Sequence, residues 1–197
     1  SNSIEAIAYL RSGTQEHGEL DLKYYLVPIL TGNDKPAKEH GVTNLVILTR
    51  PESRGQLRLR SADPMDKPII DANYLSDERD LEVLRKGVRI ARNIFSQKAY
   101  DPYRGREYLP GAECQSDEEL DAFFRDTCLV NYEAVGTCKM GHDELAVVND
   151  KLQVHGIEGL RVVDGSVMPR ITTGDPSATI IMIAEKAAEM ILQAARA

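Results

Sequence analysis

Residues 42–60 read VTNLVILTRPESRGQLRLR, and this stretch decides the fold class. Val42–Thr49 is a short run rich in β-branched and aliphatic residues, which is typical of a strand. A turn of Arg, Pro, Ser and Gly follows at 50–55, and Leu57 and Leu59 then alternate with polar neighbours, as in a half-buried hairpin strand. A strand, a turn and a second strand predict an antiparallel sheet.

Segments on both sides of this stretch extend the prediction. Ile4–Arg11 and Leu20–Leu30 have the composition and bounding residues of two more strands. Ser76-Asp77 opens a helix that runs to about Ser96 and places its apolar residues on one face: Leu81, Leu84, Val88, Ala91, Ile94 and Phe95. We therefore expect an α+β fold, in which helices pack on one face of an antiparallel sheet.

The C-terminal half contains two further helices. Ser116-Asp117-Glu118-Glu119 matches a capping box, followed by the apolar residues Leu120, Phe123 and Phe124. Gly159–Val163 has the composition of a buried strand, and Ala178–Ala195 that of a strong helix. In this helix Ile180, Ile183, Ala187 and Ile191 form an apolar stripe, and we expect part of it to contact another polypeptide or to lie open.

Composition excludes several classes of protein. The 197 residues are 42% hydrophobic and 28% charged, with 24 Lys plus Arg against 31 Asp plus Glu, which excludes intrinsic disorder and makes a nucleic-acid partner unexpected. No apolar run has the length of a membrane span, and the N-terminus has no signal-peptide pattern, so we expect a cytoplasmic protein without a transmembrane segment. The three cysteines form no CxxC pair, and we expect no metal site.

One loop-to-helix junction carries the functional signal. Asp164–Pro169 and Thr173–Thr179 together place a loop rich in Gly, Pro, Ser and Thr at the start of the C-terminal helix. Loop amides and the helix dipole favour negative charge at such a position, which suits a phosphate or the electron-rich edge of a reduced flavin.

Several blocks resemble, in order, the glucose–methanol–choline (GMC) family of flavoprotein oxidoreductases, especially its choline-dehydrogenase-like members. The blocks are Ser53-Arg54-Gly55 with Leu57-Arg58-Leu59, Asp101–Glu107, Gly136–Gly141, Val154-His155-Gly156 with Gly159–Asp164, and Ile183–Ala188. The resemblance spans nearly the whole chain. It implies the C-terminal part of such an enzyme, which transfers a hydride from an alcohol carbon to the N5 atom of FAD.

The resemblance also implies how the chain is divided. Residues 1–158 correspond to the substrate-binding domain, and residues 159–197 to a strand, loop and helix that return to the FAD-binding domain. The glycine-rich dinucleotide fingerprint is absent from this sequence. A companion N-terminal FAD-binding fragment is therefore expected to hold most of the FAD, with Asp164, Gly165, Asp175, Pro176 and Ser177 approaching the flavin from this chain.

Two residues depart from the family pattern at the catalytic site. The family has a His-Pro pair before the segment that matches Val135–Gly141, and here this pair is Glu133-Ala134. The second family residue, an Asn or His, corresponds to Asp175. If Glu133 and Asp175 share a pocket, repulsion and desolvation would raise at least one pKa, so that one carboxylate could act as a general base.

Three alternatives stay open beside the alcohol oxidoreductase. Loss of the histidine is compatible with a catalytically weakened homologue or with a non-redox, lyase-like member that keeps the flavin for structure. Absence of the nucleotide fingerprint is compatible with a binding module that holds no flavin. His142, His155 and Cys138 lie near the motif, and we expect structural roles for them.

Overall fold

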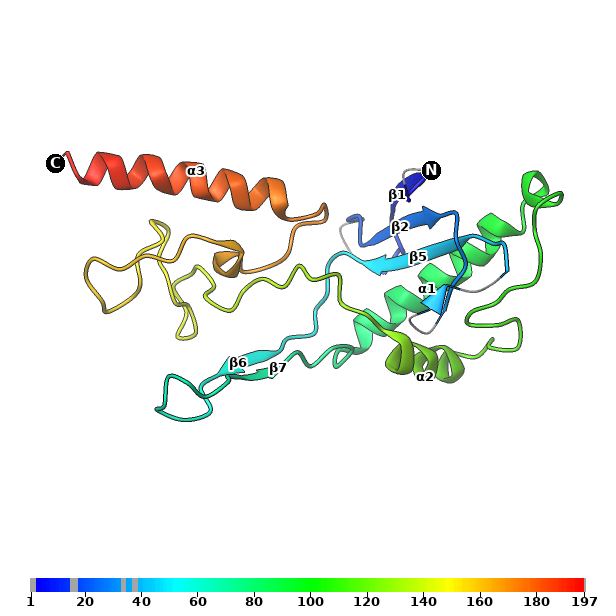
Figure 1. The fold of residues 1–197 in the computed structure, drawn as a ribbon, viewed down its shortest axis with the longest axis horizontal. Coiled ribbons are helices and arrows are strands. Elements are labelled where there is room, and N and C mark those ends of the chain that lie inside the picture. Colours follow the sequence, from blue (N-terminus) through cyan, green and yellow to red (C-terminus); the bar gives the residue numbers. More distant parts are fainter. Residues whose placement is uncertain (1–2, 15–17, 33–34, 37–38, 197) are drawn as a thin grey trace. The chain divides into compact units, whose positions relative to one another are not determined.

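The computed structural model describes residues 3–14, 18–32, 35–36 and 39–196. The chain divides into two compact units, which are described separately: residues 1–54 with 73–129, and residues 55–72 with 130–197. The elements are β1 (Ala6–Leu10), β2 (Leu22–Val27), β3 (Thr31–Gly32), β4 (Lys35–Pro36), β5 (Thr43–Leu48), β6 (Gln56–Arg58), β7 (Ile69–Asp71), α1 (Glu78–Phe95), η1 (Lys98–Tyr100), α2 (Asp117–Thr127), η2 (Gly165–Val167) and α3 (Ser177–Ala194). Figure 1 labels the three α-helices and the strands β1, β2, β5, β6 and β7.

The first unit is built on an antiparallel sheet of order β1-β2-β5. Leu22 pairs with Leu10 on one side and Leu48 on the other, so β2 is the central strand. β3 and β4 form a separate two-stranded ladder. The three strands predicted around residues 4–11, 20–30 and 42–49 are confirmed.

Helix α1 packs against one face of this sheet, because Gly87 lets the helix backbone approach β2 and β5 closely. A Cβ atom at Gly87 would lie only 2.6 Å from Val46 Cγ1 and 3.0 Å from Leu22 Cδ2. The Tyr24 hydroxyl donates a hydrogen bond to the Gly87 carbonyl at 2.5 Å. Burial of this phenol raises the pKa of Tyr24 to about 12.

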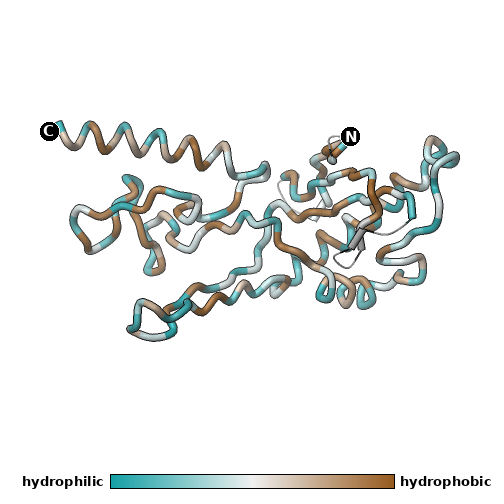
Figure 2. The backbone as a smooth tube through the Cα atoms, in the orientation of Figure 1, coloured by the Kyte–Doolittle hydropathy of each residue, from teal (hydrophilic) through white to brown (hydrophobic). Residues whose placement is uncertain are grey.

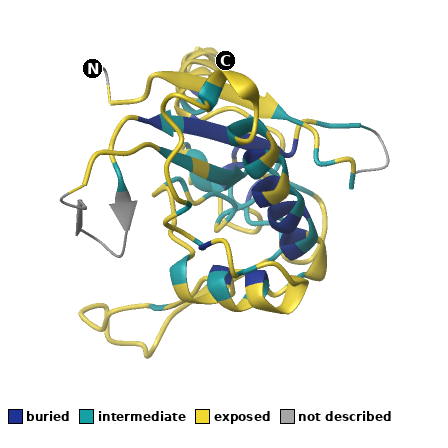
Figure 3. Cartoon of the chain, turned by 90° about the vertical axis from the view of Figure 1, so that its right-hand side faces the viewer, coloured by how far each residue is buried: buried dark blue, intermediate teal, exposed yellow. Residues whose placement is uncertain are grey.

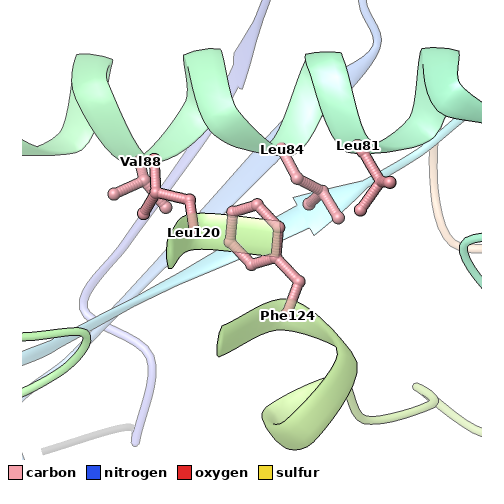
Figure 4. Close-up of a cluster of buried hydrophobic side chains, with 5 residues drawn as sticks. All are labelled: Leu81, Leu84, Val88, Leu120 and Phe124. Atoms are coloured by element: carbon pink, nitrogen blue, oxygen red, sulfur yellow. The ribbon is translucent and has the colours of Figure 1, made fainter. Parts of the chain in front are cut away.

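The hydrophobic core of this unit lies between α1, α2 and the sheet. Its buried members are Leu81, Leu84, Val88, Leu120 and Phe124, and Val46 and Leu48 of β5 pack against them. Figure 4 shows the α1 side chains facing Leu120 and Phe124, and Figure 3 shows the buried residues along one side of the helix and in the central strand. The amphipathic pattern predicted for both helices is confirmed, as is the α+β fold class.

Asp80, in the first turn of α1, is a buried carboxylate with a structural role. Its side chain is almost fully removed from solvent and accepts hydrogen bonds from the Glu52 and Ser53 backbone amides at 2.7 and 2.9 Å. The helix itself begins at its N-cap Asp77, which accepts from the Arg79 amide. Asp80 therefore fixes the chain that follows β5 to the start of α1.

Helix α2 begins with the predicted capping box. Ser116 Oγ accepts from the Glu119 amide, and Glu119 Oε2 accepts from the amides of Ser116 and Gln115, both at 2.9 Å. These backbone donors lower the pKa of Glu119. The sequence signature was sufficient here because every partner lies within four residues.

The capping box at the start of α2 makes the stability of the protein depend on pH. Because the folded-state pKa of Glu119 is lowered, its contribution to stability is complete above the unfolded-state value of about 4.3 and is lost as the pH falls through the folded-state value. We expect Glu119→Gln to unfold at lower urea concentration than the wild type at pH 6. The difference should shrink as the pH is lowered below 4. A difference that stays constant between pH 6 and pH 3 would contradict this assignment.

The second unit contains a hairpin in which β6 pairs with β7. The expectation that Gln56–Arg60 continues a hairpin from the strand at 42–49 was wrong, because β6 takes β7 as its partner and not β5. Gly55 explains how this hairpin closes. A Cβ atom there would lie 2.3 Å from the Asp71 carbonyl oxygen, so only glycine permits the close approach.

The strand predicted over Gly159–Val163 is absent from the described residues. Only an isolated antiparallel bridge between Gln153 and Arg161 forms, because Gly156 and Gly159 adopt positive φ angles and fold the chain back on itself. The predicted boundary between residues 158 and 159 lies inside the second unit. The assignment of residues 159–197 to a FAD-binding domain stays a prediction.

Helix α3 covers a small hydrophobic cluster of the second unit. Ala187 is buried with Val148, Leu152 and Val167, and Ile183 packs against them. The predicted stripe is therefore divided, since Ile191 at its end is 45% exposed. Other apolar residues of α3 also face solvent: Ile181, Met182 and Leu192. Figure 2 shows hydrophobic positions along several turns of this helix. Among the described residues, no helix is long and apolar enough to cross a membrane.

Candidate functional site

Two loops of the second unit are joined by backbone hydrogen bonds. The Cys138 amide donates to the Ser166 carbonyl at 3.0 Å, and the Met140 amide donates to the Val167 carbonyl at 2.8 Å. Gly136 adopts φ +90° in this turn, a conformation that favours glycine. The turn at 136–141 is thus fixed along the segment that contains η2.

Gly165 lets the start of α3 approach the η2 segment, which is bound to the turn at 136–141. A Cβ atom at Gly165 would lie 3.0 Å from Ile180 Cδ1 and 3.9 Å from Val135 Cγ1. Residues separated by 45 positions in sequence therefore meet around one glycine. The loop that follows Glu133, the η2 segment and the first turn of α3 converge, as the sequence predicted for the last two.

Glu133 and Asp175 each lie next to one of these converging segments in the sequence. Glu133 is half-buried, and its Oε2 accepts a hydrogen bond from Asn131 Nδ2 at 3.0 Å. Asp175 is exposed and precedes Pro176, the N-cap residue of α3. That the two carboxylates share one pocket stays a prediction.

The predicted cofactor-binding residues surround the same junction. Asp164 caps η2 by accepting from the Ser166 amide at 2.8 Å, while Gly165 begins that turn. Pro176 is buried at the N-cap of α3 and supplies no side-chain acceptor, and Ser177 is exposed in the first turn. An electron-rich group at this end of an 18-residue helix would be favoured by the helix dipole.

Sequence reasoning missed the ion pair that stabilises the turn. Lys139 Nζ lies 2.7 Å from both carboxylate oxygens of Asp143, and this ammonium lowers the pKa of Asp143. The i,i+4 spacing of opposite charges was the available signal. His155 also contacts the turn, with its Nε2 3.1 Å from the Gly141 carbonyl oxygen, while His142 is exposed. Within the described residues, no group of three or more His, Cys, Asp or Glu side chains is placed to hold a metal ion.

The family model for GMC oxidoreductase matches residues 51–184, which include both converging loops and the first half of α3. The chain belongs to the GMC oxidoreductase family. This match confirms the resemblance that the sequence blocks indicated.

Comparison with individual proteins agrees with this family assignment. The chain is 47% identical over 193 residues to an oxygen-dependent choline dehydrogenase from Escherichia coli, a match that covers 97% of this chain and 34% of that enzyme. Among solved structures it is similar to pyridoxine 4-oxidase from Mesorbium loti, with a TM-score of 0.83 and 32% identity over 95% of this chain and 37% of that one. A fungal aryl-alcohol oxidase gives a TM-score of 0.78 and 30% identity, covering 92% and 29%. The chain spans about a third of the length of the curated relatives it matches.

Proposed function

We propose that this chain is the C-terminal part of a FAD-dependent enzyme that oxidises a small alcohol. The observation that carries the proposal is the convergence of Val135, Gly165 and Ile180 around one point, within residues that match the GMC family. The names of the relatives support alcohols as the substrate class, since choline dehydrogenase and aryl-alcohol oxidase both act on them.

FAD, when bound, would supply the acceptor for the hydride that leaves the alcohol carbon. The residues of this chain that we assign to its flavin edge are Asp164, Gly165, Asp175, Pro176 and Ser177. Gly165 keeps the backbone close to α3, and the helix terminus favours negative charge beside it. Most of the cofactor site is assigned to polypeptide that this chain does not contain.

Glu133 and Asp175 are the groups we assign to the reacting end. As the hydride leaves, the hydroxyl proton passes to a carboxylate oxygen of one of them, which leaves the aldehyde as product. Asn131 donates to Glu133 at 3.0 Å and holds its carboxylate on the converging loop. An ionised carboxylate opposes the negative charge that develops on the alcohol oxygen, so this pair is expected to be slower than a pair containing histidine.

The exposed apolar residues of α3 support a companion polypeptide as the partner of this chain. Ile181, Met182 and Leu192 are 63, 56 and 58% exposed on α3. Exposed apolar side chains that lie together on a surface mark a site of interaction with another polypeptide. We assign this face to contact with the FAD-binding part.

Flavin retention tests the cofactor proposal. The protein to use is a joined enzyme, in which this chain is fused to the part of the Escherichia coli choline dehydrogenase that lies outside the 34% match. We expect the joined enzyme to keep FAD through gel filtration and this chain alone to lose it. Substituting Gly165→Leu should lower retention by displacing Ile180 in the first turn of α3, whereas Gly105→Leu, at a glycine with open space around it, should have no effect. Equal retention by the two variants would contradict the assigned site.

A further inference from the structure

His155 is an exposed residue whose ring contacts the turn at 136–141. Its Nε2 lies 3.1 Å from the Gly141 carbonyl oxygen. A carbonyl oxygen only accepts hydrogen bonds, so Nε2 carries a proton and is the donor. The ring of His155 therefore holds the last residue of a turn that begins three positions after Glu133.

Backbone hydrogen bonds on two sides make the turn a link between two other segments. On one side, the amides of Cys138 and Met140 donate to the η2 segment, as described above. On the other side, the Lys139 carbonyl accepts from the Val147 amide at 2.9 Å. A change in the position of the turn is therefore transmitted to η2.

The backbone of His155 is bonded to the second of these segments. The His155 amide donates to the Val147 carbonyl at 3.0 Å, and Val147 is also the residue whose amide holds the turn. One residue thus fixes the outer segment through its backbone and the end of the turn through its ring. Because the ring is exposed, its removal leaves no cavity, and the loss is that of the hydrogen bond and not of core packing.

The turn also fixes the part of this chain that we assign to the flavin edge. Cys138 and Met140 hold η2, which begins at Gly165 and has Asp164 as its N-cap. If the turn is loosened at Gly141, the groups on η2 become less ordered before the cofactor binds. Ordering them on binding then costs affinity.

We propose that His155 is a positioning residue for the cofactor: its hydrogen bond to Gly141 holds the turn at 136–141 and, through the turn, the η2 segment at the flavin edge. This role rests on the proposed function, because FAD is taken as the bound group. His155 is assigned no contact with FAD or with the substrate.

Two variants of the joined enzyme separate the hydrogen bond from the rest of the side chain. His155→Leu removes the donor. His155→Gln keeps one, because the amide nitrogen of Gln is the same number of bonds from Cα as Nε2 of His. His142→Leu is the matched control, at an exposed histidine next to the same turn. The rate of FAD release, followed by flavin fluorescence, and hydrogen–deuterium exchange at residues 138–141 are measured for each protein.

We expect FAD release from His155→Leu to be about fivefold faster than from the wild type, which is the size of effect of one hydrogen bond. The amides at 138–141 should also exchange faster, since the turn opens locally more often. His155→Gln should restore both rates, and His142→Leu should change neither.

Each measurement can overturn a different step of the proposal. Release of FAD at the wild-type rate by His155→Leu would overturn the positioning role, even if the turn exchanged faster. Unchanged exchange at 138–141 in that variant would overturn the hold of His155 on the turn, and equal rates in the Leu and Gln variants would overturn the hydrogen bond as its cause.

The exchange measurement also separates this proposal from the proposed function. A joined enzyme that holds no FAD would contradict the proposed function. Faster exchange in His155→Leu than in His155→Gln would then still support the hold on the turn, because exchange requires no cofactor.

Discussion

Replacing Glu133 with histidine in the joined enzyme is expected to accelerate flavin reduction by primary alcohols by about a hundredfold, the lower end of the effect of a positioned acid–base group. Negative charge develops on the alcohol oxygen as its proton and the hydride leave. A protonated imidazole stabilises that charge, whereas the ionised carboxylate of Glu133 opposes it. Stopped-flow measurement of flavin absorbance under anaerobic conditions gives the rate for each variant.

Two control variants show which property of the side chain matters. Glu133→Gln removes the charge without supplying an imidazole, and it should give a smaller gain than Glu133→His. Asp175→Asn, compared with Glu158→Gln at an exposed carboxylate of the same unit that has no assigned role, tests whether the second carboxylate takes part. Fast reduction by the wild type, together with a loss of rate in Glu133→His, would contradict the expectation that the carboxylate pair is slower than a pair containing histidine.

Replacing Asp80 with alanine is expected to lower the free energy of unfolding by about 3 kcal/mol. The substitution removes a buried carboxylate that accepts from the Glu52 and Ser53 amides, and each hydrogen bond to a charged group contributes about 1.5–3 kcal/mol. Urea unfolding followed by circular dichroism measures the change.

Glu82→Ala is the matched control, because Glu82 is an acidic residue of the same helix with a partly exposed partner. Its ion pair with Lys86 at 2.9 Å is partly solvated, and its loss should cost no more than about 0.5 kcal/mol. Asp80→Asn should fall between the two, since it keeps one acceptor oxygen. Equal losses in Asp80→Ala and Glu82→Ala would contradict the structural role of Asp80.

The parts of the fold that the sequence predicted are those decided by local patterns. The periodicity of Leu81, Leu84 and Val88 identified α1, and the Ser116–Glu119 box identified the start of α2, because the interacting groups are neighbours in sequence. The partner of β6 was not predictable in this way. Alternation of Leu57 and Leu59 shows that a strand exists, but the choice between β5 and β7 depends on the Gly55 backbone approach, which only the folded chain shows.

The candidate site also combines features that the local sequence predicts with contacts between segments that are far apart in the chain. The loop-to-helix junction at 164–179 was visible because glycine, proline and helix signals follow one another in the sequence. The approach of Val135 to Gly165 and Ile180 was not visible, since it depends on hydrogen bonds between segments that are far apart in the chain. Gly159–Val163 has the residue types of a strand, yet the glycines at 156 and 159 turn the chain and leave a single bridge.

Anaerobic mixing of the joined enzyme with a panel of small primary alcohols tests whether this chain is part of a flavoenzyme that oxidises alcohols. We expect the absorbance of the oxidised flavin to be lost in the presence of at least one alcohol, with one aldehyde formed per flavin reduced. The wild-type reaction is expected to be slow at neutral pH, and the Glu133→His variant provides the faster reference. A joined enzyme that retains FAD while both the wild type and Glu133→His keep their flavin oxidised with every alcohol would contradict the claim and favour non-redox chemistry.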